Sequence, residues 1–309
     1  ITNLSKGGFC MKKILSVFLS VMMFFTLSIP AFAADYSDSS VTSVTINEYD
    51  VYVHTRTASP DELAEAGVPS EQVKLIKSNM IEDELTRLSK LTTEELTDLG
   101  YSIQQIAILH DYNGERIENA PELRGIFADM TASFSKVSAS TTSLTVQVRW
   151  TWSSHPALCG VAITDMIAMR WQGTNTAGQP INVAFNSSGS SCNVKYYSTV
   201  GETYKFSQNA SIVCDSPYDH AYAYIPMALE KPGDMDNYAK TGTMKIRVNR
   251  TGTDSIKEAA FVFGYGHTTV VISPSLSLPA SFGIGFSTGT EKMVEKAIRM
   301  NNAGTITKY

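Results

Sequence analysis

The chain has 309 residues, of which 43% are hydrophobic, so it is long enough for a sizeable core and for one or two domains. Against 25 Lys and Arg residues it has 30 Asp and Glu residues, which gives a formal net charge of −5. Because there is no basic surplus overall, nucleic acid is a poor partner for this chain.

The first 34 residues are typical of a secretory leader. Lys12-Lys13 is its positive part, and residues 14–27 form its apolar run. Ala31-Phe32-Ala33 is an A-x-A cleavage site. The apolar run is shorter than the about 20 residues that span a bilayer. We therefore expect residues 1–33 to be a leader with a signal peptide, cleavage after Ala33 or Ala34, and a secreted, extracellular chain.

Residues 34–58 predict one or two N-terminal strands that can join a later sheet. Val44 and Ile46 alternate with polar residues, and the phase then shifts at Asn47-Glu48 before a second alternation from Tyr49 to Val53. A shift of this kind indicates a bulge or a break between two short strands.

Residues 59–130 have helical periodicity and contain an internal repeat of about 18 residues. Ser59-Pro60-Asp61-Glu62 and Thr92-Thr93-Glu94-Glu95 are both helix starts with a capping residue and a Glu three positions later. In each copy a glycine, Gly67 or Gly100, follows the first helix and can end it. The sequence therefore predicts a small acidic helical unit with a duplicated helical hairpin, either packed on itself or serving as a docking surface.

Residues 131–141 have no helical period and predict a linker or a lead-in to a strand. Over residues 142–309 the apolar residues recur at every second position, in short segments separated by turn residues. Eight to ten such strands predict an antiparallel β-sandwich or barrel, with one short C-terminal helix at residues 291–300. The predicted fold class is therefore α+β.

Residues 270–286 form the longest alternating stretch, with Ser and Gly between the apolar residues. One interpretation is one or two core strands whose small-residue face lies under helices or a second sheet. The other is a membrane-inserting β-hairpin, which also alternates apolar and small polar residues.

Three cysteines follow the leader. Cys192 and Cys214 flank strand-like segments, so they either form a disulfide or remain, like Cys159, small buried hydrophobic residues. A hydrolase alternative would pair Cys159 as nucleophile with His267 as base, but no protease signature surrounds them. The spacing of His, Cys and acidic residues matches no zinc or calcium motif, and the sequence has no Gly-rich phosphate-binding loop, so no metal or cofactor is predicted.

The best polar and aromatic cluster consists of Asp219, His220, Tyr222 and Tyr224. A loop with these side chains can bind a sugar or a peptide, whereas the alternative is the start of a strand with amphipathic tyrosines. The sequence as a whole predicts a secreted, non-enzymatic binding protein whose partner is a cell-wall glycan, a protein or a membrane surface. The alternatives are a pore-forming-like β protein acting through residues 270–286 and a hydrolase with an unidentified site.

Overall fold

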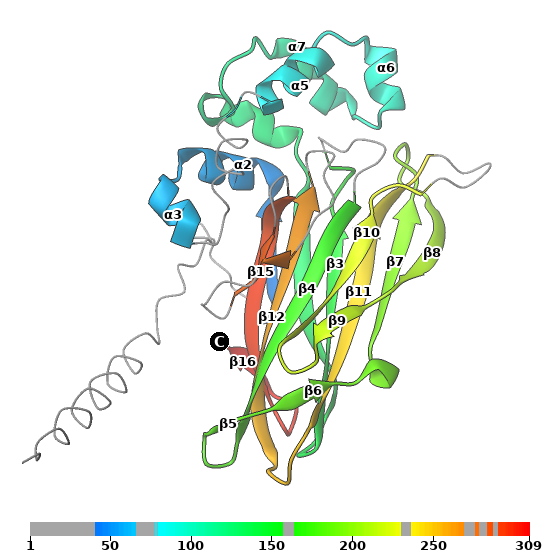
Figure 1. Ribbon diagram of the computed structural model, residues 1–309. Helices are drawn as coiled ribbons and strands as arrows, with labels where there is room; N and C mark the ends of the chain where they lie inside the picture. The colour runs from blue at the N-terminus through cyan, green and yellow to red at the C-terminus, as the bar shows by residue number, and fades with distance from the viewer. Residues whose placement is uncertain are drawn as a thin grey trace, which may run out of the picture. The chain divides into compact units, whose positions relative to one another are not determined.

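The computed structural model describes residues 41–65, 78, 80–156, 164–229, 236–268, 276–277, 283–286 and 290–309. Two antiparallel sheets, which pack face to face as a β-sandwich, contain about half of these residues, and short helices lie between the first two strands of the chain (Figure 1). The α+β class with a duplicated helical hairpin is therefore wrong, and the chain is mostly antiparallel β.

The first sheet, sheet A, has the strand order β1-β2-β3-β11-β7-β8, and β6 pairs with β11. Its strands are β1 (Ser43–Asn47), β2 (Asp129–Ala139), β3 (Ser143–Trp152), β6 (Val183–Phe185), β7 (Ser191–Tyr197), β8 (Tyr204–Ala210) and β11 (Tyr238–Arg250). Residues 131–141, given above as a linker or a lead-in to a strand, thus lie mostly in β2.

The second sheet, sheet B, has the strand order β16-β15-β12-β4-β10-β9, and β5 pairs with β4. Its strands are β4 (Thr164–Asn175), β5 (Pro180–Ile181), β9 (Val213–Ser216), β10 (His220–Pro226), β12 (Ile256–Thr268), β15 (Thr290–Asn301) and β16 (Ile306–Lys308). Alternate side chains of both sheets fill one core, in which Trp150 and Trp152 of β3 and Phe261 and Phe263 of β12 are completely buried.

The helices are short and have a hydrophobic cluster of their own. They are α2 (Glu48–Thr57), α3 (Pro60–Glu65), α5 (Met80–Leu88), α6 (Thr93–Asp98) and α7 (Ile103–Asp111), and short 3₁₀ turns follow at Ile117–Asn119, Pro121–Gly125 and, between β6 and β7, Ser187–Gly189. The capping boxes of Thr92 with Glu95 and Ser102 with Gln105 are both formed. Most of the first repeat, residues 66–77, lies outside the described residues. Among the described residues, no helix is long and apolar enough to span a membrane.

Residues 48–57 form helix α2 and not the predicted second strand. Asn47 ends β1 and caps the helix, since its side chain accepts a hydrogen bond from the backbone N–H of Tyr49 at 2.9 Å. Tyr49, Tyr52 and Arg56 then recur at helical spacing and are buried. The alternation of Tyr49, Val51 and Val53 was therefore coincidental, and the phase shift at Asn47 marks a helix start.

The predicted C-terminal helix at residues 291–300 is also wrong, because these residues form strand β15. They are good helix formers, but they pair along β12, with a bulge opposite Tyr265 and Gly266. Val294, Ile298 and Met300 are buried in the core at even spacing. Tertiary pairing has overridden the local helix propensity.

The alternating stretch 270–286 is described only in part. Leu276–Ser277 and Gly285–Phe286 pair as the short hairpin β13–β14. Ile284 is completely buried, Phe286 is 3% exposed, and both belong to a small cluster with Met166, Ala168 and Val262 on the outward face of sheet B. These described apolar residues thus cover the outside of a sheet and do not enter the main core.

The helical segment begins and ends at the same point of sheet A. β1 pairs with β2 in the register Asn47 with Asp129, and the N–H of Glu48 donates to the carbonyl of Ala128 at 3.0 Å. All the helices in residues 48–128 are therefore inserted between two neighbouring antiparallel strands.

Candidate functional site

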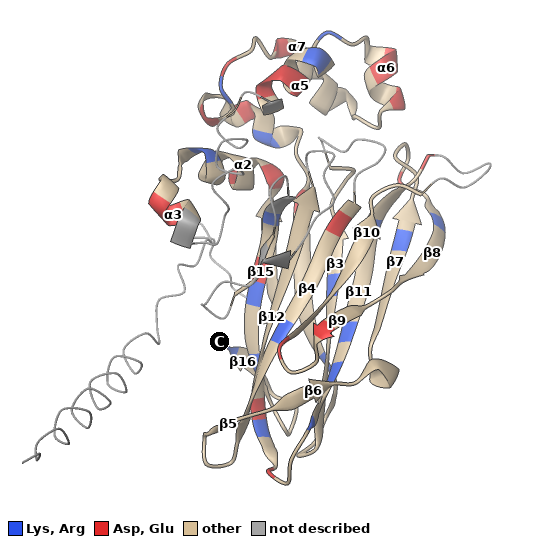
Figure 2. Cartoon of the chain, viewed as in Figure 1, with Lys and Arg blue, Asp and Glu red and all other residues tan. Residues whose placement is uncertain are grey.

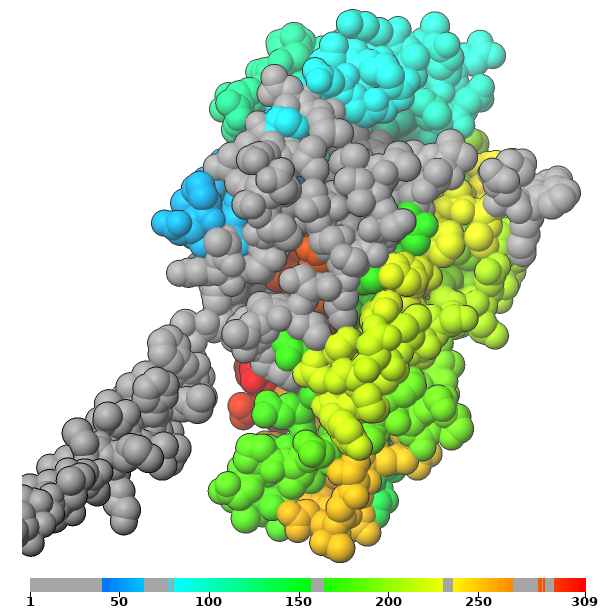
Figure 3. All heavy atoms as spheres, viewed as in Figure 1, coloured from blue at the N-terminus to red at the C-terminus, as the bar shows by residue number. Residues whose placement is uncertain are grey.

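Three of the predicted site residues, His220, Tyr222 and Tyr224, form a row of rings along β10. We call them the tyrosine row. Ala221, Ala223 and Ile225 alternate with them and face the core, so the three rings point outward from sheet B. The Tyr222 ring lies 6.4 Å from His220 and nearly parallel to it, and Tyr224 meets it edge-on at 5.7 Å. Tyr224 is 40% exposed. The atoms of β9 and of the start of β10, coloured yellow-green, lie at the surface on this side of the molecule (Figure 3).

Carboxylates fix the tyrosine row in place. The hydroxyl of Tyr222 donates to Asp215 of β9 at 2.8 Å, and this hydrogen bond, together with burial, raises the pKa of Tyr222 to about 12. Asp219 lies 3.0 Å from the Nδ1 of His220 and accepts a hydrogen bond from Arg170 of β4 at 3.0 Å. The structure therefore brings all four predicted residues together. Sequence reasoning missed Asp215 and Arg170, because Arg170 reaches Asp219 only through the pairing of β4 with β10.

Arg170 also connects the tyrosine row to the covering hairpin. Its other terminal nitrogen donates to the carbonyl of Gly283 at 3.0 Å, and the N–H of Ile284 donates to Glu295 of β15 at 2.8 Å. Tyr222 packs against the same small cluster as Ile284. His220 and Tyr222 are therefore held in place by neighbouring side chains, while Tyr224 stays accessible to solvent.

A second group of polar residues lies in the protein interior around Asp165, the second residue of β4. Its carboxylate accepts hydrogen bonds from the Tyr265 hydroxyl at 2.6 Å and from the Thr268 N–H at 2.9 Å. Both of its oxygens lie 3.0 Å from the Nδ1 of His267. Asp165, Tyr265 and His267 are completely buried. This network joins strands β4 and β12 at one end of the sandwich.

Glu48 extends this network to helix α2. One of its carboxylate oxygens lies 3.8 Å from the Nε2 of His267, and the other accepts a hydrogen bond from the Ala128 N–H at 2.8 Å. Glu48 is completely buried as well. Because the second nitrogen of His267 faces Glu48 and has no access to solvent, the arrangement is suited to holding α2 on the sandwich and not to contacting a substrate.

The predicted pairing of His267 with Cys159 remains a prediction, because Cys159 lies outside the described residues. An imidazole oriented by a carboxylate, as His267 is by Asp165, provides two of the three members of a nucleophilic triad. His155 lies near His267, and burial followed by repulsion from His267 lowers the pKa of His155 to about 4. The imidazole of His155 is therefore neutral at pH 7.

Cys192 and Cys214 are free thiols in the structure, so of the two alternatives for this pair the disulfide is not formed there. Iodoacetamide at pH 8 is expected to alkylate Cys214 faster than Cys192 in the folded chain. Burial raises the pKa of both thiols, but Cys192 is 2% exposed with a pKa of about 12, whereas Cys214 is only half-buried. Peptide mapping by mass spectrometry measures the two rates, with urea-unfolded chain as the control. Equal rates in the folded chain would contradict this assignment.

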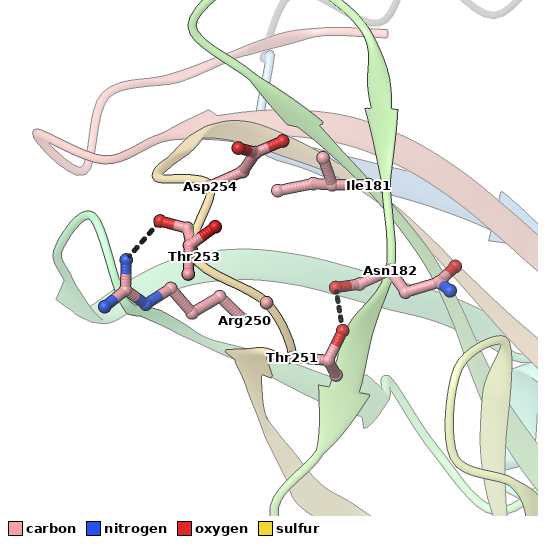
Figure 4. Close-up of a pocket in the computed structure, with 7 residues that line it drawn as sticks. Ile181, Asn182, Arg250, Thr251, Thr253 and Asp254 are labelled. Carbon is pink, nitrogen blue, oxygen red and sulfur yellow. Dashed lines mark hydrogen bonds between the residues drawn. The ribbon is translucent and has the colours of Figure 1, made fainter.

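A pocket of about 270 Å³ lies away from both polar clusters, between the β5–β6 region and the β11–β12 loop (Figure 4). Its lining residues are Ile181, Asn182, Arg250, Thr251, Gly252, Thr253 and Asp254. Arg250 donates to the carbonyl of Thr253, and Thr251 donates to the carbonyl of Asn182, both at 2.9 Å. These polar groups thus stabilise the loop itself, and none of them belongs to the predicted site.

Comparison with known proteins gives only distant likenesses. No protein-family model matches the sequence, and a search of curated proteins finds no match. Among solved structures, the chain is similar to AvmM, which is described as catalysing macrocyclization in alchivemycin A biosynthesis, with 12% identity, a TM-score of 0.27, and coverage of 57% of this chain and 90% of that one.

Two similar structures are described as binding domains. The collagen-binding domain of a Staphylococcus aureus adhesin has 12% identity and a TM-score of 0.25, and the match covers 55% of this chain and 95% of that one. The KRT10-binding region domain of the pneumococcal serine rich repeat protein PsrP has 12% identity and a TM-score of 0.18, with coverage of 54% and 87%. At these values the likeness establishes neither a common family nor a common function.

Proposed function

We propose that this chain is an exported, non-enzymatic binding protein that holds a protein partner through the tyrosine row. The proposal rests on the exposure of Tyr224, which is 40% exposed. Its neighbour Tyr222 is held by the hydrogen bond to Asp215 and by packing against the small cluster that contains Ile284. Tyr224 meets this fixed ring edge-on at 5.7 Å, and tyrosine is enriched among the residues that dominate interface energies.

The charges beside the row favour a protein partner with arginine or lysine side chains. Asp215 accepts a hydrogen bond from the hydroxyl of Tyr222, and a cationic side chain that pairs with this carboxylate can also lie over a ring of the row, whereas Asp219 is already paired with Arg170. Export is part of the proposal on the basis of the predicted leader.

Binding is expected to be at least about tenfold weaker after Tyr224→Ala, which is the size of loss that follows truncation of an interface anchor. The probes are peptides selected on the immobilised chain from a random peptide library and measured by isothermal titration calorimetry. Tyr204→Ala is the matched control, because Tyr204 is 51% exposed but lies on β8 of the other sheet.

Selected peptides rich in Arg or Lys that lose affinity for Tyr224→Ala and not for Tyr204→Ala would support the proposal. Peptides that bind both variants equally, or a library that yields no binder, would rule out the tyrosine row as the binding surface.

A further inference from the structure

Three basic side chains on the outward face of sheet A each lie between two hydroxyl or amide side chains on the neighbouring strands. Arg149 of β3 lies between Ser133 and Thr243, Lys195 of β7 between Thr241 and Ser207, and Lys245 of β11 between Gln147 and Ser191. We call Arg149, Lys195 and Lys245 the basic face. Figure 2 shows Lys and Arg in blue on β7, β8 and β11 of this sheet.

The charges of the basic face are not neutralised by the protein. Within the described part of the chain, neither Arg149, Lys195 nor Lys245 forms an ion pair, in contrast to Lys240 of β11, which pairs with Glu202. The five neighbouring strands β2, β3, β11, β7 and β8 of sheet A contain a single acid, Asp129. Its carboxylate accepts a hydrogen bond from Asn47 at 3.0 Å. A chain with a net charge of −5 therefore has one acid-poor, positively charged surface.

The spacing of these charges suits a long anion. Neighbouring strands lie about 4.8 Å apart and alternate residues along a strand about 6.7 Å apart, which separates the three charges by roughly 8–14 Å. Flanking hydroxyl and amide groups can donate hydrogen bonds to anionic groups and to sugar hydroxyls. The three basic side chains and the cross-strand neighbours named above include no aromatic ring on which a nucleobase could stack. They also include no apolar side chain that could enter a lipid layer.

We propose that the basic face binds a linear anionic polysaccharide. This function does not depend on the tyrosine row, because the two surfaces lie on different sheets. Arg149 and Lys195 are exposed, and Lys245 is half-buried, so a polymer lying across β3, β11 and β7 can reach all three side chains.

Heparin is the test probe, and its affinity for the purified chain is measured by calorimetry at about 50 mM and about 200 mM salt. We expect binding that weakens with salt, as charge neutralisation requires. The triple variant Arg149→Gln, Lys195→Gln, Lys245→Gln should bind at least about tenfold more weakly. The matched control is Lys257→Gln, Arg299→Gln, Lys308→Gln, which removes one Arg and two Lys from exposed positions of sheet B and should change the affinity less than about twofold.

Circular dichroism and thermal unfolding confirm that both triple variants are folded before their affinities are compared. Three outcomes would overturn the proposal: no heparin binding at low salt, an equal loss in both triple variants, or equally tight binding to phosphatidylserine vesicles or to DNA. The last outcome would mean that the surface recognises negative charge alone.

Discussion

Replacing Asp165 with alanine is expected to lower the free energy of unfolding by about 3–5 kcal/mol, the cost of removing one partner from a buried ionic network. The Asp165 carboxylate accepts from Tyr265 and Thr268 and contacts His267, all of them buried. The alanine variant removes this carboxylate acceptor from three groups that stay in the interior. Urea unfolding followed by tryptophan fluorescence is a suitable measurement, because Trp152 packs against His267 at 5.4 Å.

Two further substitutions make this result interpretable. Asp165→Asn keeps the shape and one acceptor oxygen, so it should cost less than the alanine variant. Asp98→Ala removes an exposed acid from α6 and should change the free energy of unfolding by less than about 0.5 kcal/mol. A loss below about 1 kcal/mol for Asp165→Ala would show that the network does not hold the two strands and α2 together.

Gly242→Ala is expected to lower the free energy of unfolding by about 1–3 kcal/mol or more through overpacking. Gly242 pairs directly with Trp150, and an added Cβ would lie 2.1 Å from the Cζ2 of that ring. The ring has nowhere to move, because it is completely buried and lies against Phe263 and Tyr265. The midpoint of urea unfolding at constant slope measures the change.

Gly252→Ala is the matched control, since nothing lies within 4 Å of the Cβ that it would add and its φ is not in the left-handed region. This control should be neutral or stabilising by up to about 1 kcal/mol, because alanine restricts the unfolded chain. Equal free energies of unfolding for Gly242→Ala and Gly252→Ala would contradict the close packing of Trp150 against Gly242.

Local signals predicted the elements that local interactions determine. The alternation of apolar residues over residues 142–309 indicated strands such as β3, and the pair of Thr92 with Glu95 identified a helix start. Each of these signals is complete within ten residues, so no distant contact is needed to interpret it.

The wrong predictions concern segments whose structure is decided by distant partners. Residues 291–300 have helix-forming side chains but pair with β12, about 30 residues or more away for most of their length. The tyrosine row could be found because its three rings alternate along one strand, whereas the contact of Arg170 with Asp219 spans 49 residues and that of Asp165 with His267 spans 102. Nothing in either short motif indicates such a partner.

The insertion of residues 48–128 between β1 and β2 has a consequence for how this protein can diverge. Its two ends meet at Glu48 and Ala128, which are hydrogen-bonded but 80 residues apart in the sequence. An antiparallel strand pair can be closed by a connection of almost any length, from a tight turn upward. Related chains can therefore lengthen, shorten or replace the helical segment without changing the register of any strand of sheet A. The one condition is that a buried carboxylate still lies beside His267, as Glu48 does.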